Sequence, residues 1–584
     1  MSLPDLTPHR YPLVWRWIIE RVWRVEHAFE RAHADGRAEN DTRIRILVVA
    51  AIFSLGFLVM AGGAVWSATL SDAGKGGRAY AGAPERADLV DREGRLLAAN
   101  LPHYTLSVDT REVWSRREVR TALLKALPRL KPSQVDRALA AERRGVVLRG
   151  LTPGEKARIH DLGLPGVVFD PEQRRVYPLG SLAAHLLGYD EKGGEPVAGA
   201  EKALRDEILK AGAESRPVAL SIDVRVQAAL EEELALAAAQ YSPKGAVGVI
   251  TNVQTGEILG MASWPDFDPN YPGRANPEQL RNRAAASVFE MGSTFKAFTV
   301  AIGLDTSVAT PDSTFDARTP LKMGYRTIHD YHGTNRILTL REVFNHSSNI
   351  GTAKLALAVG ADRMASYFAA LGLTKRAQVE LLESTRPLTP KKWDEDDMAS
   401  VSFGHGINVS PLALAQAMGA VLNGGKMVPL TIRKMEAGKR PDGPRVMSET
   451  TTLSMLQLMR GNVVDGTGRK ADAPGLMVGG KTGTGEKYDP EIRGYSSYKQ
   501  VGSFAAVFPT DGPADAERYF VLILMDEPQG GIRTGGWVAA PAVGKIVDRV
   551  APFLGVKRRL PAPSLPTTPT YVASARVAQP TGGL

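Results

Sequence analysis

Cysteine is absent from all 584 positions of this sequence. The chain therefore forms no disulfide, and a metal site in it would lack thiolate ligands. The absence suits an exported protein, because it avoids wrong disulfides in an oxidising compartment, but it does not locate the chain by itself.

Blocks of like charge are also missing. The formal net charge is +9, and lysine and arginine are spread along the chain instead of forming basic runs. We interpret this charge as a solvated surface, with attraction to anionic components of a cell envelope as the weaker alternative. A nucleic-acid partner is not expected.

Charged side chains are absent from one long apolar stretch, residues 46–70. As a helix rising 1.5 Å per residue, this stretch would span roughly 37 Å, against a hydrocarbon core of about 30 Å. We therefore predict a single transmembrane helix in the inner membrane. The alternative is a cleaved signal peptide, for which residues 61–64 supply small side chains.

The flanks of this stretch predict its orientation. Arg43 and Arg45 precede it, which favours a cytoplasmic segment over residues 1–45 and a periplasmic remainder.

Residues 12–35 mix tryptophan with arginine and predict either an amphipathic helix on the membrane surface or a solvated tail. At the other end, the proline-rich residues 556–584 are expected to be disordered.

A second apolar stretch begins with a serine and a lysine three residues apart. Ser293 stands at the start of a predicted buried helix, and Lys296 follows one turn later on the same face. The lysine amine could accept the proton of the serine hydroxyl if burial or a nearby cation lowers its pKa. Taken alone this pattern means little, because Ser496 and Lys499 repeat it in a polar segment that is typical of a loop.

Two further motifs follow in the sequence. Ser347-Ser348-Asn349 is compatible with an ordinary turn before a helix. The segment at 481–484, Lys-Thr-Gly-Thr, is compatible with a glycine-rich strand end, but glycine there would also let a peptide ligand approach the strand closely. Together, the three motifs supply a nucleophile, two amines and a carboxylate-binding segment, and they predict an acyl-transfer enzyme.

In order and spacing the motifs resemble those of the penicillin-recognising serine enzymes. The segments 86–98, 175–180 and 183–189 extend the resemblance to class B penicillin-binding proteins over about residues 84–550. Matches at 347–351, 403–411 and 482–487 are similar to the FtsI-type division transpeptidases. Met291 and Gly485 depart from the usual pattern, in which proline and alanine are common.

The resemblance implies an α/β (α+β) fold. Its catalytic domain would hold an antiparallel five-stranded sheet flanked by helices, with an all-helical subdomain inserted. The expected domains are a pedestal over residues 71–214 and a transpeptidase domain over residues 215–555. Sequence patterns agree by predicting hairpins and a closing helix, at 246–250 with 258–262, at 503–508 with 519–524, and at 540–550.

The resemblance also implies roles for the motif residues in an enzyme that needs no cofactor. Ser293 would attack the penultimate D-alanine of a peptidoglycan stem pentapeptide, and Lys296 would act as general base. Ser347 would relay a proton, while Asn349 would orient Lys296 and the substrate amide. The terminal carboxylate would be bound by Lys481, Thr482 and Thr484. Gly483, between them, would be a further substrate-binding position. Backbone N–H groups of Ser293 and Thr484 would hold the oxyanion.

The expected partners are stem peptides, β-lactams, a membrane-embedded glycan polymerase of the SEDS type and other division proteins. Competing interpretations are an elongation-type transpeptidase, a D,D-carboxypeptidase or β-lactamase, and a non-catalytic sensor or scaffold. Three weaker patterns are not assigned a function. Residues 329–332 contain two histidines, but we interpret them as a surface loop and not as a metal site, and we interpret the acidic residues 394–397 as a solvated loop. Glu290 precedes the predicted helix and need not face the cleft.

Overall fold

The computed structural model describes residues 23–24, 27, 30–31, 34, 38–69, 86–191, 194–324, 326–331, 333–489 and 491–559. They belong to two compact units, Met1–Ala83 and Pro84–Leu584. Most of the predicted amphipathic segment at 12–35 and nearly all of the proline-rich tail lie outside the described residues.

The first unit contains one long helix, α2 (Ala38–Thr69). Its large apolar side chains are exposed, as Phe53 and Phe57 illustrate with 70% and 71% of their surface accessible. Within the part of the chain that is described, no helix has the length and apolarity needed to cross a membrane. The predicted span over residues 46–70 is therefore not confirmed.

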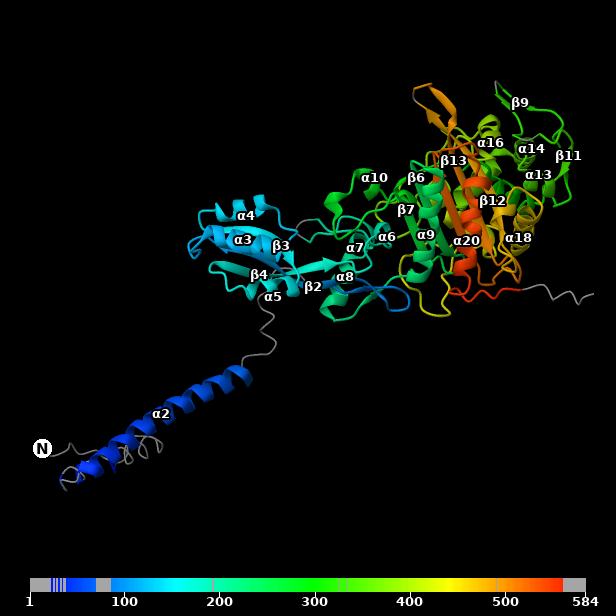
Figure 1. The fold of residues 1–584 in the computed structure, drawn as a ribbon. Helices are drawn as coiled ribbons and strands as arrows, with labels where there is room; N and C mark the ends of the chain where they lie inside the picture. Colours follow the sequence, from blue (N-terminus) through cyan, green and yellow to red (C-terminus); the bar gives the residue numbers. More distant parts are fainter. Residues whose placement is uncertain are drawn as a thin grey trace, which may run out of the picture. The chain divides into compact units, whose positions relative to one another are not determined.

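The second unit begins with a sheet built around the long strand β2 (Leu96–Asp109). It pairs with β3 (Arg144–Leu151) and β4 (Val167–Val176), and with the short β1 (Leu89–Val90), which in turn pairs with β5 (Val218–Ala219). Three helices pack apolar side chains against this sheet: α3 (Arg116–Ala126), α4 (Pro132–Leu139) and α5 (Pro153–His160) (Figure 1).

The segments that resemble a penicillin-binding pedestal meet in a buried ionic junction. Arg175 Nε lies 2.7 Å from Glu201 Oε1, and Arg86 Nη2 lies 3.3 Å from Glu201 Oε2. Burial raises the pKa of Glu201, and the two guanidinium groups oppose that shift. Short helices surround the junction: α6 (Ala184–Leu187), α7 (Gly199–Ala203) and α8 (Arg205–Ala213).

The remainder of the second unit contains a five-stranded antiparallel sheet. Its strands, in spatial order, are β12 (Gly479–Asp489), β13 (Gly494–Phe508), β14 (Tyr519–Asp526), β6 (Gly245–Asn252) and β7 (Ile258–Trp264). Both predicted hairpins are confirmed. The strand β12 forms one edge of the sheet and carries the third motif.

Two layers of helices cover this sheet. α9 (Val224–Tyr241) and α20 (Ala540–Val550) lie side by side on one face, and α20 has the bounds that the sequence predicted (Figure 1). Neighbouring residues of β6 alternate, because Ile250 faces these helices while Val249 joins the core on the opposite face. The opposite core includes α12 (Lys296–Asp305), α17 (Pro411–Leu422) and α18 (Glu449–Val464).

The chain between β7 and β12 is not all-helical, which corrects the expectation. It contains two two-stranded ribbons, β8 (Thr314–Asp316) with β11 (Ile337–Thr339) and β9 (Leu321–Met323) with β10 (Arg326–Ile328). Strands of three residues are too short to give a period-two signal in the sequence.

Several short elements complete the described structure. They are η2 (Pro272–Arg274), α10 (Pro277–Leu280), α11 (Arg283–Ala286), η3 (Gly292–Phe295), α13 (Leu340–His346), α14 (Asn349–Val359), α15 (Ala361–Ala370), α16 (Glu395–Val401), η4 (Arg469–Ala471) and α19 (Gly535–Val538). Asp394 caps α16, so the acidic residues 394–397 begin a helix and do not form a loop.

Candidate active site

Ser293 lies in the 3₁₀ turn η3, and Lys296 is the first residue of α12. The sequence predicted one continuous α-helix here, whereas the structure has a tighter turn in front of it. In a 3₁₀ turn, residues three apart lie directly above each other, so the two side chains still share one side of the backbone. Ser293 is half-buried, and Lys296 is completely buried.

The turn that carries Ser293 is held against strand β12. Gly292 has a φ of +52°, and a Cβ at this position would lie 2.2 Å from the carbonyl oxygen of Thr484. A Cβ on Gly404 would lie equally close, at 2.2 Å, to the carbonyl oxygen of Gly292. Glycine at both positions lets three backbone segments meet beside the candidate nucleophile.

Ser347 connects the three motifs. It ends α13 in the left-handed conformation, with a φ of +60°, which is unusual for a residue other than glycine. Its Oγ accepts hydrogen bonds from Lys296 Nζ at 3.1 Å and from Lys481 Nζ at 2.9 Å. Lys296 Nζ also donates to the Ser347 carbonyl oxygen. The fold therefore places both amines on one hydroxyl.

Two predicted contacts are not formed between these described residues. Lys296 makes no hydrogen bond to Ser293 Oγ or to Asn349, although the sequence predicted both. Asn349 instead donates from Nδ2 to the carbonyl oxygen of His329 at 2.8 Å. Because Lys296 is hydrogen-bonded to Ser347, the proposed base lies beside the proposed proton relay before any substrate binds.

Burial controls the protonation of both lysines. It lowers the pKa of Lys296 well below the ordinary value, the charge of Lys481 lowers it further, and the carboxylate of Asp330 opposes the shift. Burial also lowers the pKa of Lys481, to about 7. A lysine that loses its proton near neutral pH can act as a base, which an ordinary surface lysine cannot.

The third motif lies on the edge strand β12, next to the nucleophile turn. Thr482 is only 8% exposed, whereas Thr484 is half-buried and its Oγ1 accepts from the Gly535 backbone N–H at 3.4 Å. Gly483 has no room for a side chain, because a Cβ would lie 2.5 Å from the Met291 carbonyl oxygen. The strand thus packs closely behind Ser293.

Sequence reasoning missed Asp330, which it had assigned to a surface loop. Its Oδ2 accepts from Ser348 Oγ at 2.7 Å, and its Oδ1 accepts from the Ile350 backbone N–H at 2.9 Å. Asp330 therefore fixes the second motif at the start of α14. His332 lies outside the described residues, and those that are described contain no metal-binding group of three or more ligands.

Glu290 braces the segment before the nucleophile. Its Oε1 accepts from Tyr495 Oη at 2.8 Å and from the Gly406 backbone N–H at 3.0 Å, and its Oε2 lies 3.3 Å from His405 Nδ1. Burial and the adjacent carboxylate raise the pKa of Tyr495. A Cβ on Gly485 would lie 2.1 Å from the Glu290 carbonyl oxygen, so this position has no space for the methyl group of an alanine.

The second serine–lysine pattern has a structural role. Ser496 Oγ accepts hydrogen bonds from the backbone N–H groups of Tyr498 and Lys499, at 3.2 and 3.1 Å. The Lys499 amine pairs with Asp489 at 2.8 Å and so lies with the other strand of the hairpin. These contacts stabilise an irregularity in the register of β13 and bring no base to the Ser496 hydroxyl.

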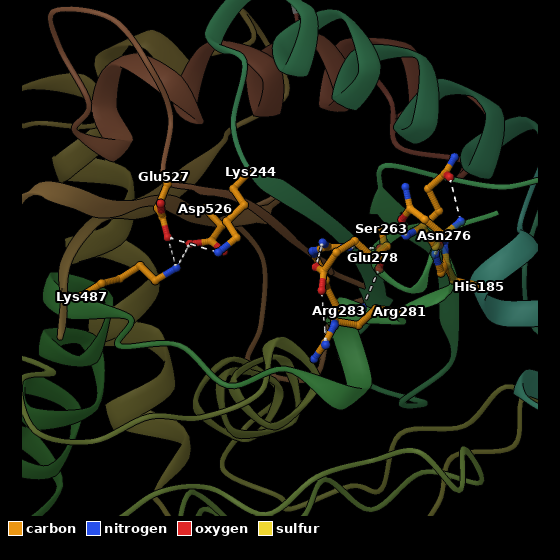
Figure 2. A network of polar contacts seen from close by, with 11 residues as sticks. His185, Lys244, Ser263, Asn276, Glu278, Arg281, Arg283, Lys487, Asp526 and Glu527 are labelled. Carbon is orange, nitrogen blue, oxygen red and sulfur yellow. Dashed lines mark hydrogen bonds and ion pairs between the residues drawn. The ribbon is translucent and has the colours of Figure 1, made fainter. Parts of the chain in front are cut away.

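A separate polar network lies beyond the third motif (Figure 2). Lys487 of β12 pairs with Asp526 at 2.8 Å and with Glu527 at 2.6 Å, both at the end of β14. In another part of the same view, Arg283 pairs with Glu278 at 2.7 Å. Lys487 thus ties the β12–β13 hairpin to the sheet, which gives it a structural position.

Two buried amines contact one hydroxyl, beside a serine turn and a glycine-lined edge strand. This arrangement defines the class of penicillin-recognising serine acyltransferases. Comparison with known proteins agrees. The penicillin binding protein transpeptidase domain matches residues 246–548, and the penicillin-binding protein dimerisation domain matches residues 81–208. The chain belongs to the class B penicillin-binding proteins, of the FtsI type.

Individual relatives extend over most of the chain. A Caulobacter vibrioides protein named "Probable peptidoglycan D,D-transpeptidase FtsI" is 61% identical over 98% of this chain and 99% of its own length. The peptidoglycan D,D-transpeptidase FtsI of Escherichia coli K12 is 30% identical over 81% of this chain and 84% of its own length. A solved structure from Atopobium parvulum, described as "a putative peptidoglycan glycosyltransferase", shares the fold with a TM-score of 0.61 at 22% identity, over 81% of this chain and 98% of its own length.

Proposed function

We propose that the protein is a peptidoglycan D,D-transpeptidase that crosslinks stem peptides through an acyl-serine intermediate. The observation that carries this proposal is the position of Ser347 Oγ, 3.1 Å from Lys296 Nζ and 2.9 Å from Lys481 Nζ, beside the Ser293 turn. Such an arrangement provides a nucleophile, a base with a lowered pKa and a route for a proton.

In the proposed acylation, Ser293 Oγ attacks the carbonyl carbon of the penultimate D-alanine. Lys296, in its uncharged form, accepts the hydroxyl proton, and the backbone N–H groups of Ser293 and Thr484 stabilise the oxyanion. An oxyanion donor of this kind is worth about 2.7–4 kcal/mol in other enzymes. Close packing of the Gly292 turn on Thr484 supports this assignment, because it keeps the two groups together.

Departure of the terminal D-alanine requires a proton on its nitrogen. Ser347 is suited to deliver it, since its hydroxyl can give a proton to the leaving amine and regain one from Lys296. An amine from a neighbouring stem then attacks the acyl-serine, loses its proton to the same groups and forms the new amide bond. Ser293 recovers its hydroxyl proton at the end of the cycle.

The proposed carboxylate site comprises Lys481, Thr482 and Thr484, with Gly483 allowing the substrate backbone to approach the strand. In support, all four lie on the edge strand β12 beside the serine turn. Asn349 is proposed to orient the substrate amide. Its Nδ2 donates one of its two N–H groups to the His329 carbonyl oxygen, which leaves the carboxamide oxygen and the second N–H for this contact.

The test of this function is turnover of a defined stem-peptide donor by the full-length protein in detergent. With an acceptor amine, the expected product is the crosslinked peptide. Without it, only slow hydrolysis is expected. Hydrolysis as the main reaction in both cases would identify a carboxypeptidase, and fast hydrolysis of a penicillin in its place would identify a β-lactamase. Acylation without turnover would identify a sensor. A Ser293→Ala variant provides the matched control.

We also propose that a pedestal over residues 71–214 precedes a catalytic domain over residues 215–555. We further propose a role in septal wall synthesis, with a SEDS-type glycan polymerase and other division proteins as partners. Supporting the role is the resemblance to FtsI along nearly the whole chain. A fluorescent fusion should gather at midcell during division. Even labelling of the side walls would favour an elongation role instead.

We further propose that residues 46–70 anchor the chain in the inner membrane, with residues 1–45 in the cytoplasm. The segment has no charged residue, and Ile52, Leu55 and Leu58 on α2 are each more than 60% exposed. The full-length chain should resist alkaline carbonate extraction, and a chain starting after residue 75 should be soluble and still bind penicillin. A shortened, soluble periplasmic form would instead identify a cleaved signal peptide.

A further inference from the structure

Thr467, which none of the three motifs contains, reaches the candidate carboxylate site through its hydroxyl. It lies between α18 and β12, is exposed, and has its Oγ1 2.8 Å from Thr482 Oγ1. Asn462, a fully buried residue of α18, lies on the other side, with its Oδ1 3.1 Å from Thr467 Oγ1. The three side chains form a short hydrogen-bonded row that ends at the third motif.

The direction of the hydrogen bonds in this row follows from the contacts of Asn462. Its Nδ2 donates to the Gly480 carbonyl oxygen at 2.7 Å, and its Oδ1 accepts from the Thr467 backbone N–H at 3.2 Å. Both contacts fix the same orientation of the amide, so Oδ1 can only accept. Thr467 therefore donates its single hydroxyl proton to Asn462, and Thr482 must donate its own proton to Thr467.

This direction has a consequence for ligand binding. While Thr482 donates to Thr467, its proton is not available to a substrate carboxylate. When a carboxylate arrives, Thr482 can turn its proton to it, and Thr467 can then turn its own proton from Asn462 Oδ1 to Thr482 Oγ1, which also accepts from Lys481 Nζ at 3.4 Å. Asn462 Oδ1 keeps the backbone N–H of Thr467 as a donor, so no buried polar atom loses its last partner.

We propose that Thr467 is a positioning residue, which holds the Thr482 hydroxyl toward the carboxylate of the acyl donor and supplies it with a hydrogen bond once that carboxylate is bound. The inference rests on the proposed function, since it assigns Thr482 to the carboxylate site. A row of hydroxyls that donate in one direction strengthens its last hydrogen bond. Without Thr467, Thr482 Oγ1 keeps the long 3.4 Å contact from Lys481 Nζ but loses its 2.8 Å hydroxyl partner, and the side chain can rotate away from the cleft.

Benzylpenicillin and its methyl ester provide the test, because they differ only in the free carboxylate. With the full-length protein, Thr467→Val should weaken the noncovalent binding step of benzylpenicillin by about tenfold, the size expected for one hydrogen bond to a charged group. The first-order acylation rate at saturation should be unchanged. Acylation by the methyl ester should be the same in variant and wild type.

Two controls separate positioning from loss of structure. Thr467→Ser keeps the hydroxyl and should restore benzylpenicillin binding to the wild-type level. Thr482→Val should weaken binding by itself, and adding Thr467→Val to it should cause no further loss, because Thr467 acts through Thr482. Equal losses for the acid and the ester, or additive losses in the double variant, would overturn the proposal.

The outcome can be distinguished from a failure of the proposed function. If wild-type protein is not acylated by benzylpenicillin at all, the transpeptidase assignment is wrong. If wild-type protein is acylated and Thr467→Val binds benzylpenicillin equally well, only the role of Thr467 is wrong.

Discussion

Ser348 Oγ donates a hydrogen bond of 2.7 Å to Asp330 Oδ2, which joins the second motif to a segment 18 residues earlier in the chain. The same carboxylate accepts from the backbone N–H of Ile350 and raises the pKa of Lys296 against the effects of burial and of Lys481. Asp330 therefore acts on the site in two ways, by geometry and by charge.

Asp330→Asn separates these two effects. Loss of the hydrogen bond to a charged acceptor should lower the penicillin acylation rate by about tenfold. Loss of the negative charge should lower the pKa of Lys296 further, so the uncharged base persists to lower pH. The acidic limb of the acylation pH profile should then move to lower pH. Stopped-flow acylation between pH 5 and pH 9 measures both effects.

A matched control for this variant is Asp312→Asn, since Asp312 is exposed and pairs with Arg341 on the surface. It should leave the rate and the pH profile unchanged. If Asp330→Asn lowers the rate without moving the acidic limb, the electrostatic part of the argument is wrong and only the structural part stands.

Covalent labelling distinguishes the two serine–lysine patterns. Ser293 lies in a turn beside the buried amines, whereas Ser496 Oγ accepts two backbone N–H groups and has no base. After treatment with a penicillin, mass spectrometry should find the adduct on the peptide that contains Ser293. Ser293→Ala should abolish the adduct, and Ser496→Ala should keep it. An adduct on the Ser496 peptide would contradict the assignment.

Lys296 and Lys481 should respond differently to arginine. Arginine keeps the positive charge but is not deprotonated in proteins, so Lys296→Arg removes the proposed base. Its acylation rate should fall by about 10² to 10⁴, the usual contribution of general acid–base catalysis. Lys481→Arg keeps a cation for the substrate carboxylate and should retain more activity. Equal rates for the two variants would show that the roles are assigned wrongly.

Local patterns in the sequence predicted those structural features that depend on residues close together along the chain. Alternating apolar residues gave the hairpins of the catalytic sheet, and an amphipathic stretch gave α20 with its correct bounds. The motifs indicated Ser293, Ser347 and Lys481 as a set, and the fold brings the two lysines to Ser347.

Contacts between distant segments could not be predicted in the same way. Asp330 and Thr467 lie in segments with no motif, and only the folded chain places them against Ser348 and Thr482. The expected hydrogen bond between Lys296 and Ser293 is not formed, for a related reason. Left-handed Ser347 presents its carbonyl and hydroxyl oxygens to the same amine, and a one-letter sequence carries no sign of that conformation.

Gly292→Ala tests the contact between the nucleophile turn and β12. A methyl group at this position would lie 2.2 Å from the Thr484 carbonyl oxygen, and the φ of +52° is unfavourable for alanine. The turn should shift away from the strand and separate the two proposed oxyanion donors, so acylation should fall by at least about 10². Gly273→Ala, where a Cβ meets nothing within 4 Å, is the control and should react at the wild-type rate.

The stability of the protein should depend on pH through Lys481. Its folded-state pKa of about 7 lies below the ordinary lysine value of about 10.4, so the unfolded state binds more protons between these two values. The free energy of unfolding should therefore rise as the pH increases from 7 to 10.4, and this contribution should be constant below pH 7. Lys481→Met removes the contribution of Lys481, while buried Lys296 keeps its own. The variant should be inactive yet more stable than wild type, by on the order of 4 kcal/mol at pH 7, with a difference that shrinks toward pH 10.

Thermal unfolding at pH 6, 7, 8, 9 and 10 measures this trend. Lys375→Met, at an exposed position, should follow the wild-type pH trend, with a stability difference from wild type that does not change with pH. A Lys481→Met variant that is less stable than wild type at pH 7 would mean that the hydrogen bonds of this amine outweigh the cost of burying it.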